Sequence, residues 1–294
     1  MSDPKINMVV DEDVESNEGL CKLTGKHGTF ARSHIIPRAL TRLSAVGERM
    51  IEVGFDLDSK KRYDSWFDTH LVIREGEKIL EELDTRAIAI LRKHKMLWSS
   101  WSGATKLVVD DLIGPPDGAN FRTVVFEESE ILQLFFLSLV WRSAASDRPE
   151  LSDVKLADDI LEDIRLRVLN KKMGESHDYP IHLHQLTTIG IQHNRTPLKE
   201  KFTLLLDDGH ESLETAERVR IYFDGLVAHV HMFKERTVAD SYVKISLGNG
   251  PDGSTIVIGR PYLTSRTDEN IRTLVKHVSS KPNKQKKTKG TKRR

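Results

Sequence analysis

Apolar side chains recur at helical spacing through much of the first half of the chain. Residues 75–95 have apolar positions three and four apart, acids at their start and basic residues at their end, which predicts an amphipathic helix. Residues 127–145 are apolar on nearly every side, which predicts a buried helix at the centre of the fold. Ser152 or Asp153 is placed to cap a further helix that runs through Asn170.

From Tyr179 onward the pattern changes to that of short strands. Apolar runs are separated by turn residues, and Phe223-Asp224-Gly225-Leu226 is a good hairpin signal. The predicted strands cover residues 181–186, 187–192, 202–206, 219–223, 226–232, 243–247 and 255–258, and one late helix covers 268–277. The expected fold class is α+β, with an N-terminal lobe and helices followed by a mostly antiparallel β C-terminal region.

Charge separates the two ends of the chain from its body. Residues 1–18 form an acidic leader, and residues 281–294 form a basic tail with eight basic residues and no acid, although the whole chain has a net charge of only +1. Neither end has apolar residues to bury, so both are expected to be disordered. Between them we expect a lobe over 19–97, a helical core region over 98–178 and a β-rich domain over 179–280.

Composition narrows the class of protein. Apolar residues make up 38% and charged residues 30% of the 294 positions, which is typical of a globular protein with a sizeable core. The start of the chain lacks the apolar core of a signal peptide, and the longest apolar run, 131–141, is too short to span a bilayer. The single cysteine excludes an intrachain disulfide framework. We therefore expect a cytoplasmic protein without a membrane partner.

The segment Ser33-His34-Ile35-Ile36-Pro37 is the most informative motif. Residues 29–36 are β-prone, and Pro37 suits the first turn of a short helix over 38–43. His34 is therefore expected at the end of a strand, on the face opposite Ser33 and Ile35. A lone histidine is more often an ordinary surface or core residue, so its neighbourhood decides its interpretation.

That neighbourhood resembles the HNH (ββα-metal) nuclease family, in a subfamily of bacterial proteins that have Ser-His-Ile-Ile-Pro and a later helix with Trp-Arg, as at Trp141-Arg142. The resemblance covers residues 19–95 by motif and continues faintly to about residue 200. It implies that the N-terminal lobe is HNH-like, with a ββα-metal arrangement, and that His34 is the general base.

The same resemblance assigns the remaining site residues. Asp68 lies where the family has an asparagine, so it is expected to orient His34 or to bind metal. Ser33 stands where a metal-binding His or Asp is usual, and Glu77 and Glu81 match the metal ligands of the helix. One divalent cation, Mg²⁺ or Mn²⁺, is the implied cofactor.

The family's structural zinc site is not retained. Cys21 is present, but Thr24, Ile73 and Gly76 stand where three further cysteines are usual. A structural zinc needs about four N or S ligands, so we expect no structural zinc. Apolar packing is expected to hold the lobe instead, with the available side chains Leu20, Leu23, Phe30 and Ile36.

Two other patterns suggest metal sites. Glu77 and Glu81 lie one helical turn apart and suit an oxygen-preferring cation, or they form a solvated acidic face. The second pattern is the spacing H-x-H, which occurs twice on predicted strands, at His182 with His184 and at His229 with His231. No Cys, Asp or Glu is placed to complete a site with these histidines, so we do not interpret them as metal ligands.

Basic residues indicate where a nucleic acid would bind. The tail is either an electrostatic arm for phosphates or a solvated end, and Arg142 pairs with an acid of the protein or with a phosphate. The predicted nucleic-acid contacts are Arg32, Arg38, Lys284, Lys286, Lys287, Lys289, Lys292, Arg293 and Arg294.

Two functions from different classes follow. One is an HNH-type metal-dependent endonuclease that cleaves phosphodiesters, with DNA favoured over RNA as the substrate and bacterial antiphage defence as a candidate role. The other is a catalytically silent HNH-derived module that binds nucleic acid or a partner protein in a multi-component system such as bacterial antiphage defence.

Overall fold

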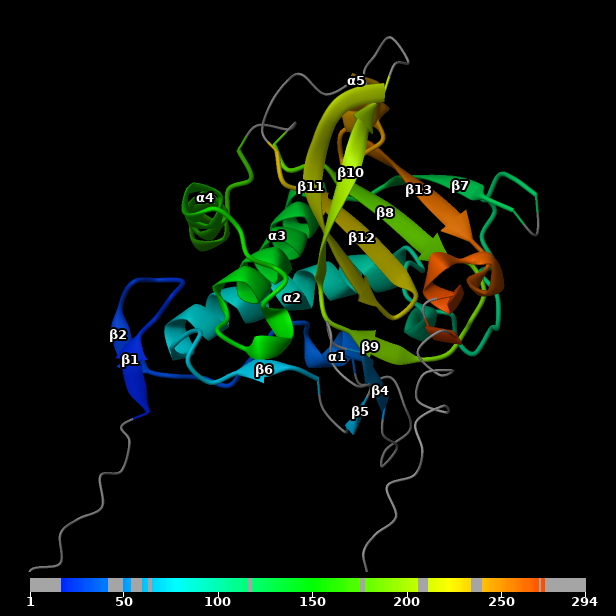
Figure 1. Cartoon of the computed structure of the whole chain (residues 1–294). Helices are drawn as coiled ribbons and strands as arrows, with labels where there is room; N and C mark the ends of the chain where they lie inside the picture. Colours follow the sequence, from blue (N-terminus) through cyan, green and yellow to red (C-terminus); the bar gives the residue numbers. More distant parts are fainter. Residues whose placement is uncertain are drawn as a thin grey trace, which may run out of the picture.

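The computed structural model describes residues 17–41, 50–53, 60–62, 65–115, 118–174, 178–205, 211–233, 240–269 and 271–272. These residues confirm the α+β fold class: a six-stranded sheet lies beside a group of helices (Figure 1). None of the helices in these ranges is both long and apolar enough to cross a bilayer.

Two long helices agree with the sequence pattern. Helix α2 (Arg74–Lys93) and helix α3 (Ser129–Ala145) lie where the amphipathic and the fully apolar segments predict them. Helix α4 (Asp158–Asn170) begins later than Ser152 or Asp153, because the Asp153 carboxylate accepts a hydrogen bond from the backbone N–H of Lys199 and does not cap the helix. The remaining helices are short: α1 (Arg38–Thr41) and α5 (Asp240–Lys244).

The strand order of the large sheet is β10-β11-β12-β8-β13-β7. Strand β13 runs parallel to β8, and every other neighbouring pair is antiparallel. The strands are β7 (Asn120–Val125), β8 (Ile181–Leu186), β10 (Leu198–Leu205), β11 (Glu211–Phe223), β12 (Leu226–His231) and β13 (Ser254–Arg260). The sheet is thus mostly antiparallel, as the turn signals predict.

Three details of the predicted strands are wrong. Residues 243–247 are not a strand: α5 covers their start, and Tyr242 within it packs its ring 4.2 Å from that of His182. Residues 187–192 form a connection, because the backbone of Thr187 bonds to Leu107 and Arg260 across two other segments. Strand β7 has no counterpart among the predictions. The late helix covers residues 266–269 and 271–272, and the rest of its predicted range lies outside the described residues.

Three small sheets complete the fold. Strand β1 (Glu18–Leu20) pairs with β2 (His27–Thr29), and β3 (Ser33–His34) pairs with β6 (Phe67–Asp68), so the single strand expected over 29–36 is two strands. The third sheet has the order β5-β4-β9, with β5 (Lys60–Arg62), β4 (Met50–Val53) and β9 (His193–Arg195). Since β4 is parallel to β9, this sheet joins the lobe to the β-rich region.

Helix α3 is the centre of one hydrophobic core that extends from Cys21 to Val257. Its Phe136 ring stacks on Phe223 of β11 at 6.2 Å, and Phe135 contacts the same ring edge-on. Helices α2 and α4 both pack on α3 (Figure 1). The apolar face of the sheet therefore lies against α3, as the fully apolar sequence of that helix predicts.

The opposite face of the sheet, which we call the back face, is polar. Arg220 of β11 lies directly opposite His229 of β12, which in turn lies opposite His182 of β8. Because strand side chains alternate between faces, the residues two positions away share this face. The back face thus presents Arg218, Arg220, His182, His184, His229 and His231.

Candidate functional site

The motif around His34 is built from two short strands and the helix that follows them. Ser33 pairs with Asp68 and His34 with Phe67 in the antiparallel β3–β6 pair, and α2 starts six residues after Asp68 at Arg74. The backbone N–H of Ile35 extends the pairing by donating to the carbonyl of Trp66 at 3.0 Å. The order is therefore strand, strand, helix.

His34 is half-buried and held from two sides. Its ring lies 6.1 Å from the Phe67 ring across the strand pair. Its backbone carbonyl accepts a hydrogen bond of 3.2 Å from Nη1 of Arg142. The end of β3 is thus fixed to α3 as well as to β6.

Arg142 forms a buried ion pair with Asp84 of α2. The two hydrogen bonds measure 2.6 Å and 3.0 Å, and the Arg142 side chain is 2% exposed. Burial raises the pKa of the Asp84 carboxyl, and the Arg142 guanidinium opposes that shift. Of the two partners expected for Arg142, an acid of the protein or a phosphate, the structure shows the acid. Asp84 itself was not predicted, although it lies two helical turns after Glu77 and therefore on the same side of α2.

Glu77 is the predicted site carboxylate whose surroundings most resemble those of a functional residue. Its Oε2 atom is buried and has no hydrogen-bond partner in the described part of the chain. Burial raises the pKa of Glu77, while the nearby Ser33 hydroxyl, Arg142 and His34 lower it. The Ser33 hydroxyl thus faces the carboxyl, but its geometry falls outside a regular hydrogen bond. A carboxyl with a raised pKa in such a setting is typical of functional sites, though ion-pair networks also produce one.

Glu81 and Ser33 differ sharply in exposure. Glu81 is exposed on α2, and its charge contributes to the raised pKa of Asp84. Ser33 is 1% exposed, and its Oγ makes no hydrogen bond with a described residue. Ser33 and Glu77 therefore form a buried polar contact behind His34.

Asp68 is turned away from the histidine. Its carboxylate accepts hydrogen bonds from the Ser146 hydroxyl at 2.6 Å and from the backbone N–H of His70 at 2.8 Å. Asp68 is opposite Ser33, so its side chain leaves the strand pair on the other face from His34. These contacts connect β6 to the end of α3.

The predicted site residues come together only in part. His34 and Glu77 are electrostatic neighbours, with Asp84 and Arg142 beside them. Within the described residues, no three His, Cys, Asp or Glu side chains are grouped closely enough to hold a metal ion. The expected convergence of His34, Asp68 and Glu77 on one ion is therefore not found there, since the Asp68 carboxylate is bound elsewhere.

The four positions that match the family's zinc site lie near one another. The Cys21 Sγ accepts a hydrogen bond of 3.4 Å from the backbone N–H of Thr24, and a Cβ atom added to Gly76 would lie 3.0 Å from the same sulfur. Ile73 is bridged to Phe30 in the same region. Cys21 is buried and free.

Apolar packing of this lobe is largely as predicted. Leu23 and Ile36 are fully buried, and Phe30 packs against the core. Leu20 is 63% exposed, so its predicted packing role is wrong. It lies in β1, which pairs only with β2 and leaves that side chain on the outside.

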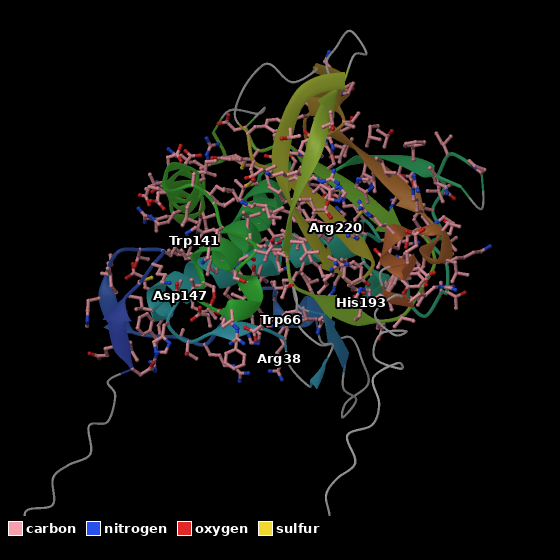
Figure 2. The ribbon with its side chains drawn as sticks, viewed as in Figure 1. Arg38, Trp66, Trp141, Asp147, His193 and Arg220 are labelled. Atoms are coloured by element: carbon pink, nitrogen blue, oxygen red, sulfur yellow. The ribbon has the colours of Figure 1, made fainter. Side chains whose placement is uncertain are left out.

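The predicted basic contacts differ in their surroundings. The Arg32 guanidinium lies 3.6 Å from the centre of the Phe67 ring, a cation–π contact, and Arg32 is exposed. Arg38 is exposed on α1, at the same end of the molecule as Trp66 (Figure 2). Residues 281–294, with all the predicted tail contacts, lie outside the described residues.

The two histidine pairs share the back face, as their spacing predicts. The His182 ring lies 4.7 Å from that of His231, and the His184 ring lies 4.6 Å from that of His229. Burial lowers the pKa of His182 to about 4 and that of His184 to about 3. These rings are therefore neutral at pH 7.

Comparison with protein-family models, with curated proteins and with solved structures finds no match for this chain.

Proposed function

We propose that the lobe is an HNH-type nuclease that hydrolyses phosphodiester bonds of nucleic acid, DNA rather than RNA, with a divalent cation. One observation carries the proposal. His34, at the end of β3, lies within electrostatic range of Glu77 of α2, and the strand-strand-helix order supports the family resemblance of Ser33–Pro37.

The donor atoms of α2 fit Mg²⁺ or Mn²⁺. Glu77 has a buried carboxylate oxygen without a hydrogen bond, and Glu81 lies one turn later with an exposed carboxylate. Mg²⁺ is commonly held by one or two carboxylates plus waters and substrate phosphate, so these two side chains are a sufficient protein share. Such an ion polarises the scissile phosphate and stabilises the leaving oxygen.

The chain itself supplies the proton transfer and the positioning. His34 takes the proton of the attacking water at a ring nitrogen. Arg142 fixes the backbone of His34, and Phe67 limits the movement of its ring. Arg32 and Arg38 are exposed on the same lobe and are suited to contact phosphates of the substrate, as is the basic tail.

A second candidate is a catalytically silent HNH-derived module that binds nucleic acid or a partner protein, for example in an antiphage defence system. The Arg142–Asp84 pair favours it, because a permanently charged guanidinium already neutralises one carboxylate of the α2 face. The engagement of Asp68 with Ser146 points the same way.

The substitution His34→Ala tests the nuclease. It should lower Mg²⁺- or Mn²⁺-dependent cleavage of DNA by about 10²–10⁴-fold and leave DNA binding nearly unchanged, because it removes the general base alone. His27→Ala is the matched control, since His27 is an exposed histidine of the same lobe. Absence of metal-dependent cleavage by the wild-type protein on duplex and single-stranded DNA and RNA would leave the silent module as the better proposal.

A further inference from the structure

The back face contains a cavity of about 260 Å³ that no part of the nuclease proposal uses. Its lining comes from β8, β10, β11, β12 and β13, and one wall comes from the segment 265–267. Figure 2 shows Arg220 over the strands of the sheet. The arginines, histidines and hydroxyl groups that line it are Arg218, Arg220, Arg260, Arg266, His184, His229, Ser265 and Thr267.

Positive charge exceeds negative charge in this cavity. The lining includes four arginines and a single acidic residue, Glu200. Arg218 takes the best contacts of that carboxylate, at 3.0 Å and 3.1 Å, and leaves Arg220 with an ion pair of 3.7 Å. Arg260 and Arg266 are exposed and form no ion pair with a carboxylate of the described residues.

Arg220 is buried without full compensation. It is 7% exposed, and its side-chain hydrogen bond goes to the Thr267 hydroxyl at 3.3 Å. Burial and the positive neighbours lower the pKa of Arg220, and burial with Arg220 beside it lowers the pKa of Arg195 to about 10. A buried charge that lacks its counter-charge is unfavourable, and a bound anion would relieve that cost.

The rest of the lining suits the uncharged part of a ligand. Leu186, Val227 and Ile258 form an apolar surface, and the neutral rings of His184 and His229 lie beside it. Ligand sites typically combine such apolar walls with a few convergent polar groups in volumes of about 300–1,000 Å³. At about 260 Å³ the cavity is slightly smaller than that range, which restricts its ligand to a small molecule.

We propose that this cavity binds a small molecule with a terminal phosphate group, no larger than a nucleoside monophosphate. The arginine forks of Arg220, Arg260 and Arg266 hold the phosphate oxygens, because a planar guanidinium matches phosphate with two parallel hydrogen bonds. The apolar wall and the histidine rings contact the sugar or base. This inference does not depend on the nuclease.

Calorimetry and thermal unfolding of the full chain test the proposal, with inorganic phosphate, ribose 5-phosphate, adenosine 5′-monophosphate and adenosine as probes. The phosphorylated probes should bind and raise the unfolding temperature, whereas adenosine should not. The ranking among them tells whether the phosphate alone, the sugar or the base is recognised.

Arg260→Gln and Arg266→Gln are the informative variants, since both side chains are exposed and should leave folding intact. Each should weaken binding of the phosphorylated probes by about 10- to 100-fold, the loss of a charge-assisted hydrogen bond. Arg74→Gln, at an exposed arginine of α2, is the control for the lost charge.

Three results would overturn the proposal. One is that no phosphorylated probe binds more tightly than adenosine. Another is that Arg260→Gln and Arg266→Gln bind like Arg74→Gln. The third is that an oligonucleotide, added as a further probe, binds while none of the small phosphorylated probes does, which would make the arginines part of a nucleic-acid surface. His34→Ala should bind the probes like the wild type, so failure of the nuclease proposal is recognised separately.

Discussion

Two buried arginines in this protein have opposite surroundings. Arg142 in α3 has a carboxylate to itself and bonds Asp84 through both Nη atoms, with the His34 carbonyl and the Ser138 hydroxyl as further acceptors. Arg220 in β11 shares the single carboxylate of Glu200 with Arg218. The charge of Arg142 is balanced by a carboxylate of the protein, whereas Arg220 can also bind an external anion.

This difference in pairing indicates a structural role for Arg142 and a ligand-binding role for Arg220. A guanidinium with a carboxylate of its own joins elements, and Arg142 joins α3 to α2 and to β3 through its Nη atoms. The buried Nε of Arg142 has no hydrogen-bond partner among the described residues. A guanidinium with incomplete pairing destabilises the free protein slightly and gains when an anion binds. The first two predictions vary these two settings.

The largest effect is expected for Arg142→Met. It leaves the Asp84 carboxylate without its partner in a largely buried position, which typically lowers the free energy of unfolding by about 3–5 kcal/mol. Urea unfolding followed by circular dichroism measures it. Because an apolar replacement of a whole ion pair is often neutral, the double variant Arg142→Met with Asp84→Leu should recover most of the loss. A double variant as unstable as the single one would show that Arg142 acts through His34 and Ser138.

Arg220→Met should behave differently. Removal of an incompletely paired buried charge is expected to change the free energy of unfolding by about 1 kcal/mol or less, in either direction. The same substitution should abolish the rise in unfolding temperature with adenosine 5′-monophosphate. Thermal unfolding with and without that probe gives both results. A loss as large as that of Arg142→Met would mean that Glu200 and Thr267 already satisfy Arg220.

The sequence predicts those features that depend on neighbouring residues better than those that depend on segments far apart in the chain. Helix α2 follows from a long periodic pattern and helix α3 from a long apolar segment. The end of β3 and the start of α1 follow from the motif that contains His34 and Pro37. The strand predicted over 243–247 is wrong, because apolar and polar residues alternate there over only five positions, and so short a pattern does not distinguish a strand from a helix. Strand β7 was missed because its partner, β13, lies far away in sequence.

The candidate sites follow the same rule. The motif identifies His34, Glu77 and Glu81. Asp84 joins this group only in the folded protein, where α3 brings Arg142 to its carboxylate. The back-face cavity combines five strands and the 265–267 segment, so its arginines are adjacent only after folding. One signal was present: Arg218 and Arg220, like the H-x-H pairs, are two residues apart and must share a strand face.

We expect the protein to lose stability in mild acid because of the buried histidines of the back face. The pKa of His182 is lowered to about 4 and that of His184 to about 3. Below about pH 6.5, the ordinary pKa of histidine, the unfolded chain therefore binds more protons than the native protein. The free energy of unfolding therefore has its full value above about pH 6.5. It falls as the pH drops toward 4, by up to about 1.4 kcal/mol per pH unit for each such histidine.

Urea unfolding between pH 7.5 and 5 measures this slope, which His184→Phe should reduce. Asp224 works in the opposite direction, because burial raises its pKa to about 6 and protonation favours the native state. Asp224→Asn should therefore steepen the loss. A free energy of unfolding that is constant over this range in the wild type would mean that the two effects cancel, and the two variants would then slope in opposite directions.

The smallest effect on stability is expected at Glu77, where the structural and functional roles can be separated. Burial raises the pKa of this carboxyl, so its ionised form is less favourable in the folded protein than in the unfolded chain, and Glu77→Gln should stabilise the fold slightly, by about 0.5 kcal/mol. Glu81→Gln is the matched control on the next turn, at an exposed position where no gain is expected. If Glu77 holds the cation, the stabilised variant should also lose Mg²⁺-dependent cleavage, which is the usual exchange of stability for function at a working site. A Glu77→Gln protein that is less stable than the wild type would instead make Glu77 a structural partner of Ser33, with its charge needed to keep the Arg142 region in place.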